Sequence, residues 1–523
     1  MNSPQLRRGL VSAIAPLVVI LLGSTRARAQ DPCGAWNVVP SPSPTEHVVL
    51  EDVFAFDKDH AWAVGREVVG GSESQTLALR WNGASWGVVP TPSPSPFAGG
   101  GWCELLAVDA LSPTDVWAAG DQRIQGPDGF VGTQILIERW NGSQWTVFPA
   151  PMTSGGSGNF VDDIEIIAPN DVWFVGDWLT FPPSSVARKE ALTMHWNGSS
   201  FSIVPAPFFD NSTIGGHGLT AVSAVSSNDV WAVGGGHDGD YVNFSYIVHW
   251  DGSSWSYKPG PTAGWYHRLY DVAARASNDV YAVGDYQDES GYHGLFLHWN
   301  GSTWTRLPDP PVGGSALEVR ADGRVSIGGG GVVVWDGSGF TDLQTFPGVS
   351  GPSVTSLEPI DACSMWAVGR QLNGASSIAS FTARLEPNGA VGTSYCSALP
   401  NSAGPGAKIS AFGSTSVSAA SLALHADACP SSVLGLFYYG TQTTQVPFGN
   451  GLRCIAGSAY RLPVLTTSST GSATHVFDFD APVAPGATIL PGSVWHFQFW
   501  YRDPPAGGAN FNLSDALTIG FTP

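Results

Sequence analysis

Aromatic, basic and acidic side chains gather at a few irregular positions of the sequence, and together they suit the binding of a sugar. The first group is the run Trp265, Tyr266, His267 and Arg268. An aromatic ring can stack on the C–H face of a sugar, and an arginine donates paired hydrogen bonds to hydroxyl or carboxylate oxygens. The other residues of the predicted ligand-binding set are His217, His237, Asp177, Trp178, Asp285 and Tyr286.

These residue types leave three interpretations of function open. The first is a non-catalytic binding or adhesion protein that recognises a glycan or another extracellular polymer. The second is a glycan-active enzyme. A lyase could use His267 as its base and Arg268 to neutralise charge, whereas a hydrolase needs two carboxylates, for which Asp177 and Asp285 are the candidates. The third is a structural component of an extracellular matrix. We favour the first and assign no catalytic residue.

Metal and cofactor chemistry has little support in the sequence. Asp238 and Asp240 have the Asp-x-Asp spacing of a calcium loop, but the remaining oxygen ligands of such a loop do not follow. The six cysteines contain no C-x-x-C pair, which argues against zinc. We therefore expect no cofactor, and calcium at Asp238 and Asp240 is the one metal site to test.

Two repeated motifs position these residues. A short apolar segment, predicted to be the inner strand of each unit, occurs seven times at a mean spacing of about 51 residues, a period typical of four-stranded propeller blades. Its central residues are Trp62, Trp117, Trp173, Trp231, Tyr281, Ile327 and Trp366. A Trp-Asn-Gly or Trp-Asp-Gly motif recurs between them and predicts two-residue type I′ hairpins. These motifs begin at Trp81, Trp140, Trp196, Trp250, Trp299 and Trp335.

The copy numbers predict a ring of seven blades that the N-terminal strand closes. The apolar segment occurs seven times but the turn motif only six, so the last blade lacks its fourth strand. Residues 34–42 closely copy residues 83–92, and we expect residues 35–40 to complete that blade beside residues 377–385. In such a ring, the loops before each inner strand and those between the second and third strands share one face around the central channel, where ligands bind.

Residues that recur in one register are expected to be structural. Four aspartates open copies of the apolar segment and are predicted to cap turns through backbone N–H groups: Asp115, Asp171, Asp229 and Asp279. Three histidines precede the turn tryptophan, where other copies carry Arg or Val, so they are not expected to be ligands: His195, His249 and His298.

The N-terminus and the charge indicate export. Residues 1–29 combine a basic start at Arg7 and Arg8 with an apolar run and an Ala-x-Ala cleavage site, which predicts a signal peptide. Its removal takes away four arginines and no acid, so the formal charge falls from −20 to −24. That charge repels nucleic acid and anionic lipid. We expect a secreted protein, extracellular or at the cell surface, with no membrane span; the oligomeric state stays open.

With the motifs Asp-Val-Trp-Ala-Val-Gly and Trp-Asn-Gly-x-x-Trp, residues 33 to about 387 resemble secreted bacterial β-propellers of the kelch and galactose-oxidase-like type, which implies the fold. The predicted propeller covers residues 30–389. Beyond it, the alternating pattern of residues 494–502 predicts a half-buried strand, and residues 390–523 a β-sandwich. Motifs at 435–440 and 499–503 resemble a C-terminal domain of unknown function on exported proteins of environmental bacteria.

Export also predicts disulfides. Cys33 enters the N-terminal strand and Cys363 lies in the turn before Trp366, so this pair is predicted to lock the seam of the ring. Cys429 and Cys454 are predicted to pair within the C-terminal domain, and Cys103 and Cys396 stay unassigned.

Overall fold

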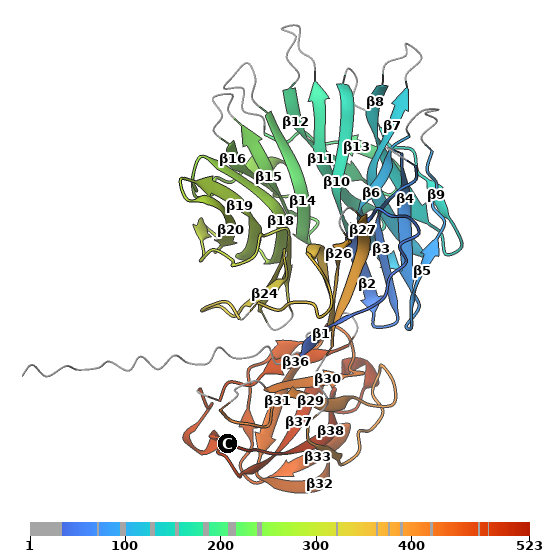
Figure 1. The fold of residues 1–523 in the computed structure, drawn as a ribbon. Helices are drawn as coiled ribbons and strands as arrows, with labels where there is room; N and C mark the ends of the chain where they lie inside the picture. The colour runs from blue at the N-terminus through green and yellow to red at the C-terminus, as the bar shows by residue number, and fades with distance from the viewer. Residues whose placement is uncertain are drawn as a thin grey trace, which may run out of the picture.

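The computed structural model is all-β and is shown in Figure 1. It describes residues 34–523 with short gaps, and all structural statements concern the described ranges: 34–70, 73–94, 101–125, 131–151, 156–180, 188–207, 216–237, 243–320, 323–341, 343–361, 364–374, 377–386, 391–418, 422–468, 471–479 and 481–523. The signal-peptide prediction, Cys33, Cys363, Asp238 and Asp240 fall outside these ranges. In the described part of the chain, no helix has the length and hydropathy needed to cross a membrane.

The larger part of the chain is a series of antiparallel meanders (Figure 1). The first two consist of β2 (Val48–Asp57), β3 (His60–Val68), β4 (Ser74–Trp81) and β5 (Trp86–Val89), then β6 (Cys103–Ser112), β7 (Asp115–Gln125), β8 (Val131–Trp140) and β9 (Trp145–Val147). The next two are β10 (Gly156–Ala168), β11 (Asp171–Thr180), β12 (Arg188–Trp196) and β13 (Phe201–Ile203), then β14 (Gly216–Ser226), β15 (Asp229–His237), β16 (Asn243–Trp250) and β17 (Trp255–Tyr257).

The series continues with β18 (Tyr266–Ala276), β19 (Asp279–Asp288), β20 (Gly291–Trp299) and β21 (Trp304–Arg306), followed by the three-stranded β22 (Ala316–Val319), β23 (Val325–Gly328) and β24 (Val332–Trp335). The last sheet holds β25 (Ser353–Asp361), β26 (Ser364–Asn373), β27 (Ser377–Glu386) and the N-terminal β1 (Ala35–Val38). The first strands of successive meanders contact one another in order, and β25 contacts β2, so the series closes into a ring.

The N-terminal strand completes the last sheet, as the sequence predicts. β1 pairs antiparallel with β27, from Ala35 opposite Glu386 to Val38 opposite Ala383. Next to this pairing, Trp36 Nε1 donates a hydrogen bond of 2.7 Å to Gln344 Oε1. The two ends of the ring therefore share one sheet, which leaves no unpaired strand edge between them.

The apolar segments form the second strand of each meander, and not the inner strand that the sequence analysis expected. The strand before each of them lies at the channel, and residues of β2, β6, β10, β14, β18, β22 and β25 line it. The tryptophans of the second strands pack between meanders: the ring centroid of Trp62 lies 5.0 Å from that of Trp140 and 5.1 Å from that of Trp145. The tryptophans of the apolar segments therefore belong to the packing between neighbouring meanders.

The Asn-Gly and Asp-Gly turns are four-residue loops, so the prediction of two-residue type I′ hairpins is wrong. Trp81 pairs with Trp86 across the loop, and Gly83 adopts φ 90° while Asn82 does not have a positive φ. Asn82 acts through its side chain instead, because Oδ1 accepts the backbone N–H groups of Ala84 and Ser85 at 3.0 and 2.9 Å. The side chain and the glycine together set the loop length.

The repeated aspartates bind side chains of the neighbouring strand, a partner that the turn-capping prediction missed. Asp171 Oδ1 lies 2.8 Å from His195 Nε2, and the pairs Asp229–His249 and Asp279–His298 have the same separation. In the second meander, Arg139 Nε donates to Asp115 Oδ1 at 2.7 Å. The histidines before the turn tryptophan are thus structural partners of the aspartates.

Residues 391–523 form three further sheets, with β28 (Thr393–Tyr395), β31 (Leu434–Gly440), β34 (Tyr460–Arg461), β35 (Leu465–Thr466), β37 (Val494–Arg502) and β38 (Phe511–Gly520) in the largest. The others hold β29 (Lys408–Gly413), β30 (Leu422–Asp427) and β36 (Ala473–Val476), and the hairpin β32 (Gln442–Phe448) with β33 (Gly451–Ala456). Two short 3₁₀ turns, η1 (Pro485–Ala487) and η2 (Pro504–Ala506), lie beside β37 in sequence.

The largest sheet is apolar on the face that it turns to the β29–β30–β36 sheet. Phe497, Phe499 and Tyr501 are fully buried there and share one core with Leu422 and Leu424. This alternation confirms the pattern predicted for residues 494–502. The opposite face is covered in part by the hairpin β32–β33.

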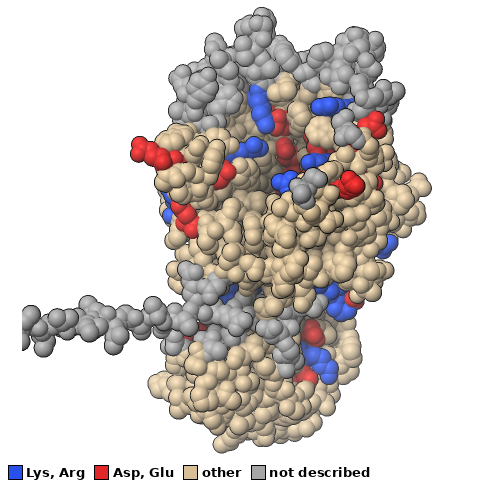
Figure 2. All heavy atoms as spheres, viewed as in Figure 1, with Lys and Arg blue, Asp and Glu red and all other residues tan. Residues whose placement is uncertain are grey.

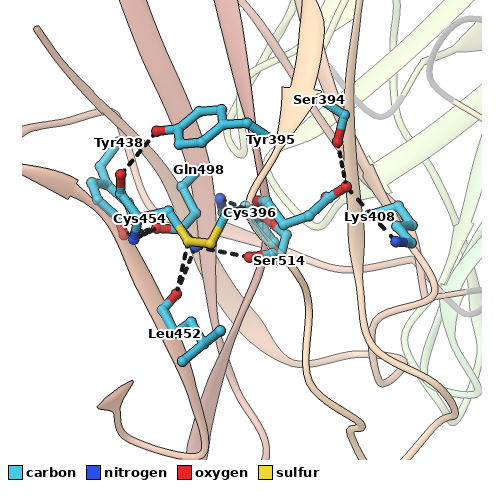
Figure 3. Close-up of a disulfide and its surroundings, with 11 residues drawn as sticks. Ser394, Tyr395, Cys396, Lys408, Tyr438, Leu452, Cys454, Gln498 and Ser514 are labelled. Atoms are coloured by element: carbon cyan, nitrogen blue, oxygen red, sulfur yellow. Dashed lines mark hydrogen bonds and ion pairs between the residues drawn. A yellow bond between two sulfur atoms is a disulfide. The ribbon is translucent and has the colours of Figure 1, made fainter. Parts of the chain in front are cut away.

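A disulfide joins Cys396 to Cys454 and ties the hairpin to the segment after β28 (Figure 3). The predicted pairing of Cys429 with Cys454 is therefore wrong, since Cys429 lies buried without a disulfide. Beside the bridge, the hydroxyl of Tyr395 donates to the carbonyl of Cys454 at 2.9 Å. A sequence without geometry could not choose between Cys396 and Cys429 as the partner of Cys454.

One buried carboxyl stands out in the ring and yields a test of the packing. Glu138 on β8 is fully buried, neither of its carboxyl oxygens has a hydrogen-bond partner among the described residues, and burial raises its pKa to about 8. The same position carries Leu79, Met194 and Val248 in other meanders. Glu138→Leu should raise the free energy of unfolding by about 1–3 kcal/mol, because it removes an unsatisfied buried polar group. Chemical denaturation of the two proteins measures this, and an equal or lower stability of the variant would contradict the packing.

The disulfide gives a second prediction. Proteolysis of the non-reduced protein should release a peptide in which Cys396 is linked to Cys454, while Cys429 should react with a thiol reagent only after unfolding, because the folded chain buries it. Mass spectrometry of the alkylated digest checks both statements. A linked peptide of Cys429 and Cys454 would reject the pairing.

Candidate functional site

The innermost strands of the ring carry β-bulges that each lift one residue out of the backbone ladder. The pairing of β10 with β11 shifts between Val161 and Asp163, and that of β18 with β19 shifts between Leu269 and Asp271. The displaced residues are Asp162 and Tyr270. Bulges commonly re-aim a side chain beside a functional site. The same shift displaces the residues Glu51, Leu106, Thr220 and Thr355 in other innermost strands.

Around Asp162 the structure gathers opposite charges at the channel. Asp177 on β11 forms an ion pair of 2.6 Å with Lys189 on β12, and Asp177 is almost fully buried. The charges of Asp177, Lys189 and Arg268 all act on the carboxyl of Asp162. Figure 2 shows basic and acidic side chains around a hollow in the upper half of the molecule, whereas much of the remaining visible face is uncharged.

Two paired glycines make room for the cations. Gly218 on β14 lies opposite Gly235 on β15. A Cβ at Gly218 would lie 2.6 Å from Cε of Lys189, and a Cβ at Gly235 would lie 2.8 Å from Cγ of Arg268. Both separations are below van der Waals contact, so any larger residue would displace the long basic side chains.

On the other side of Arg268, a tyrosine and a carboxylate form a hydrogen-bonded pair. The hydroxyl of Tyr270 donates to Asp285 Oδ2 at 3.0 Å, and the guanidinium of Arg268 lies 5.5 Å from the centre of the Tyr270 ring. Burial raises the pKa of Asp285, which the Tyr270 hydrogen bond and the Arg268 charge only partly offset.

A second group of charges continues the site towards the first two meanders. Arg66 on β3 binds Glu104 on β6 and lies 3.2 Å from Glu51. Asp121 on β7 is buried and accepts the backbone N–H of Val161 at 3.3 Å. Carboxyls outnumber cations here, so the site is acidic.

The proton affinity of Asp162 is suited to acid catalysis. Burial is the largest cause that raises its pKa, the negative charge of Asp177 raises it further, and Lys189 and Arg268 lower it, for a result of about 7. Burial also raises the pKa of Asp177, although Lys189 opposes this. A carboxyl with a pKa near neutrality can hold a proton at neutral pH and release it to a leaving group.

A second layer of carboxyls, further along the innermost strands, is structural. Asp52 accepts the N–H of Val53 in its own strand and that of Val108 in the next meander, both at 2.8 Å. Asp271 does the same for Val272 and Leu317 at 2.7 and 2.6 Å. Asp109 and Asp163 make equivalent bridges. These side chains join neighbouring innermost strands around a channel cavity of about 510 Å³.

The structure brings three residues of the predicted ligand set together: Asp177, Arg268 and Asp285, which all lie at the acidic site. Trp265, 47% exposed, and the partly exposed Tyr266 stand at the start of β18 with free ring surface. The ring of Tyr266 contacts that of Tyr292 at 6.4 Å. These residues remain predicted ligand contacts.

The other members of the predicted set are packed away or not described. His267 is buried, and its Nδ1 accepts the backbone N–H of Ser245 at 3.0 Å. His217 is buried and stacks on Tyr246, and Trp178 is partly buried against the core between the second and third meanders. Tyr286 is buried with its hydroxyl donating to Asp309 at 2.8 Å. The side chain of His237 and the residues Asp238 and Asp240 lie outside the described part.

Sequence reasoning missed the bulged and bridging residues. Asp162 and Asp163 are adjacent acids inside an apolar strand, and only a bulge lets both leave the core. This pair of adjacent acids was the sequence feature that could have pointed to the site. No sequence feature pointed to Lys189 or Arg66, because their ion-pair partners are far away in sequence. Within the described ranges, no group of three or more His, Cys, Asp or Glu side chains is arranged to hold a metal ion.

Comparison with protein families finds no match to this chain, and neither does comparison with characterised proteins. Solved structures do show similarity. A protein of unknown function from Dyadobacter fermentans has a TM-score of 0.42 and 12% identity over 67% of this chain and 98% of its own. The polysaccharide lyase Uly1 has a TM-score of 0.41 and 9% identity over 69% and 98%. The α-L-arabinofuranosidase Arb93A from Fusarium graminearum has a TM-score of 0.36 and 12% identity over 54% of this chain and 92% of its own.

These findings correct the favoured interpretation of the sequence. The similar structures with named activities are enzymes, among them an arabinofuranosidase, an arabinanase, a family-43 glycoside hydrolase, a polysaccharide lyase and a protein described as a glucose dehydrogenase. The non-catalytic binding protein is therefore not retained, and its alternative, the glycan-active enzyme, is what these names back better. They also agree with a propeller-type fold, but they give the kelch and galactose-oxidase-like subtype no support. At this level of similarity they assign no residue and no mechanism to this chain.

The bridging carboxyls make stability depend on pH. Burial raises the pKa of Asp271 to about 7 and that of Asp52 to about 6, above their values in an unfolded chain. The folded state therefore binds protons more tightly; the resulting stability is complete below about pH 4 and is lost as the pH rises through 6 to 7. Each unit by which a pKa is raised corresponds to about 1.4 kcal/mol of folding free energy that is lost as the pH rises. The melting temperature should therefore fall between pH 5 and pH 8.

Asp271→Asn is the matched test, because it removes one of these titrating groups and keeps one acceptor oxygen. Its melting temperature should depend less on pH over the same window, which differential scanning fluorimetry can follow. The exposed Asp251→Asn serves as control and should keep the wild-type slope over this window. A slope that is flat or rising with pH in the wild-type protein would refute the raised pKa values.

Proposed function

We propose that the protein is a secreted glycoside hydrolase that acts on a neutral glycan at the acidic mouth of its channel. Within this proposal the meanders are seven blades of one propeller over residues 30–389, and residues 390–523 are a β-sandwich whose two main sheets share a core. Residues 1–29 direct export and are removed. The observation that carries the proposal is the bulged Asp162 beside Asp177, with a pKa of about 7 and two cations in reach of its charge.

The roles follow from the environments of the two kinds of carboxyl. Asp162 is the general acid, because its carboxyl can be protonated near neutral pH and the residue is not fully buried. Asp177 or Asp285 supplies the second carboxylate that glycoside hydrolysis requires. Lys189 favours the ionised form of Asp177, and Tyr270 that of Asp285. Arg268 is placed to donate hydrogen bonds to sugar hydroxyls, and the hydroxyl oxygen of Tyr270, whose proton goes to Asp285, can accept one.

Hydrolysis fits this site better than elimination. A lyase needs an accessible base and must attract a uronate, but His267 is buried with Nδ1 occupied by the Ser245 amide. The excess of carboxyls over cations would also repel an anionic polymer. Trp265 and Tyr266 supply the exposed aromatic surface on which a neutral sugar can stack.

Asp162→Asn tests the proposal directly. The purified protein should release reducing ends from a neutral polysaccharide in a panel that also contains polyuronates, and the variant should lower kcat by about 10²–10⁴-fold, the usual contribution of a general acid. In the wild-type protein, kcat should fall as the pH rises above about 7, because Asp162 then loses its proton.

Asp115→Asn is the matched control, since Asp115 pairs with Arg139 outside the channel site. It should keep wild-type kcat. An unsaturated uronate product, or unchanged kcat in Asp162→Asn, would reject the hydrolase; the absence of turnover on every glycan would reject the enzyme altogether.

A further inference from the structure

The C-terminal sheets hold a second pocket, separate from the channel. It has a volume of about 400 Å³ and lies between the outer face of the β31–β37–β38 sheet and the hairpin β32–β33. The volume falls in the range of about 300–1,000 Å³ usual for small-ligand pockets. Its walls include four aromatic residues and two arginines: Tyr438, Phe448, Trp500, Phe511, Arg453 and Arg461.

The aromatic walls form a connected surface. The ring of Phe511 lies 5.3 Å from that of Phe448 and 5.6 Å from that of Trp500, measured between centroids. Phe448 is 46% exposed, although a side chain of this size is normally buried. An open aromatic wall of this kind suits the C–H face of a sugar ring.

The charge of the pocket is opposite to that of the protein. The whole chain has a formal charge of −20, yet two guanidiniums and no carboxyl line this pocket. Arg453 lies over the Phe448 ring at 5.9 Å, and Arg461 is the strand partner of Tyr438, so both cations stand beside aromatic rings. In the described ranges, no ion pair joins either arginine to an acid.

The pocket is held in a fixed shape. Gln498 is fully buried beneath the hairpin, where its Oε1 accepts the N–H of Cys454 at 2.9 Å and its Nε2 donates to the carbonyl of Leu452 at 2.8 Å. The disulfide between Cys396 and Cys454 fixes the same strand (Figure 3). A preformed site loses less conformational entropy when its ligand binds.

We propose that this pocket binds a uronic acid unit of an anionic polysaccharide. The sugar ring stacks on the aromatic wall, and its carboxylate lies between Arg453 and Arg461, because guanidinium groups match carboxylate oxygens in geometry and charge. The C-terminal domain would then attach the protein to an acidic polymer, while the channel accepts neutral glycan.

Isothermal titration of the full-length protein with an oligomer of galacturonic acid tests this proposal. Binding should be saturable and weaken with added salt, and a galactose oligomer of equal length should bind at least tenfold more weakly. Arg453→Gln and Arg461→Gln should each raise Kd at least tenfold. Arg502→Gln, which changes an exposed arginine of the same sheet outside the pocket, should leave Kd unchanged.

The outcomes separate this pocket from the channel. Asp162→Asn should bind the galacturonate oligomer as the wild-type protein does, so the pocket can fail or succeed whatever the hydrolase assay shows. Equal affinity for the two oligomers, full binding by the Arg453→Gln, Arg461→Gln double variant, or binding to anionic phospholipid vesicles but not to the oligomer would each overturn the proposal.

Discussion

Carboxylates that bridge neighbouring innermost strands are the interaction on which the ring depends. The first strands of adjacent meanders converge at the channel without forming a continuous sheet. The one parallel pairing of named strands between meanders in the described ranges joins Gly158 on β10 to Thr133 on β8, which is not a first strand. Asp52 and Asp271 instead each accept one N–H from their own strand and one from the next. Where an aspartate is missing, Ser223 accepts the N–H of Ala274 at 3.1 Å.

This solution concentrates negative charge where solvent is scarce. Each bridging carboxyl is desolvated and feels its neighbours, so its pKa rises, and the same environment extends to Asp162. The bulge that places Asp163 for bridging also takes Asp162 out of the backbone register, beside the charges of Asp177, Lys189 and Arg268. One local irregularity of β10 thus serves both the closure of the ring and the acid of the proposed site.

The sequence was informative wherever the repeat was regular. The spacing of the apolar segments predicted the meanders, and the copy of residues 83–92 at residues 34–42 predicted the pairing of β1 with β27. The assignment of the inner strand and of the turn type failed, because both depend on which strand faces the channel and on backbone angles.

The site was only partly predictable for the same reason. Asp177, Arg268 and Asp285 break the repeat and were therefore named as candidate ligand residues in the sequence analysis. Asp162 and Tyr270 instead lie inside strands, where the alternation of side chains assigns each to one face of the sheet, and the bulge changes that assignment. The burial of His267 against Ser245 could not be predicted, because it depends on the neighbouring meander. The partner of Cys454 was likewise a matter of distance in space.

The most direct test of the account is a crystal structure of the Asp162→Asn protein with a neutral oligosaccharide that the wild-type protein cleaves. The account predicts a sugar in the channel mouth, with its scissile oxygen within hydrogen-bond distance of residue 162 and a second carboxylate, that of Asp177 or Asp285, at the same sugar. A sugar bound elsewhere on the ring, with the channel mouth holding only solvent, would contradict it.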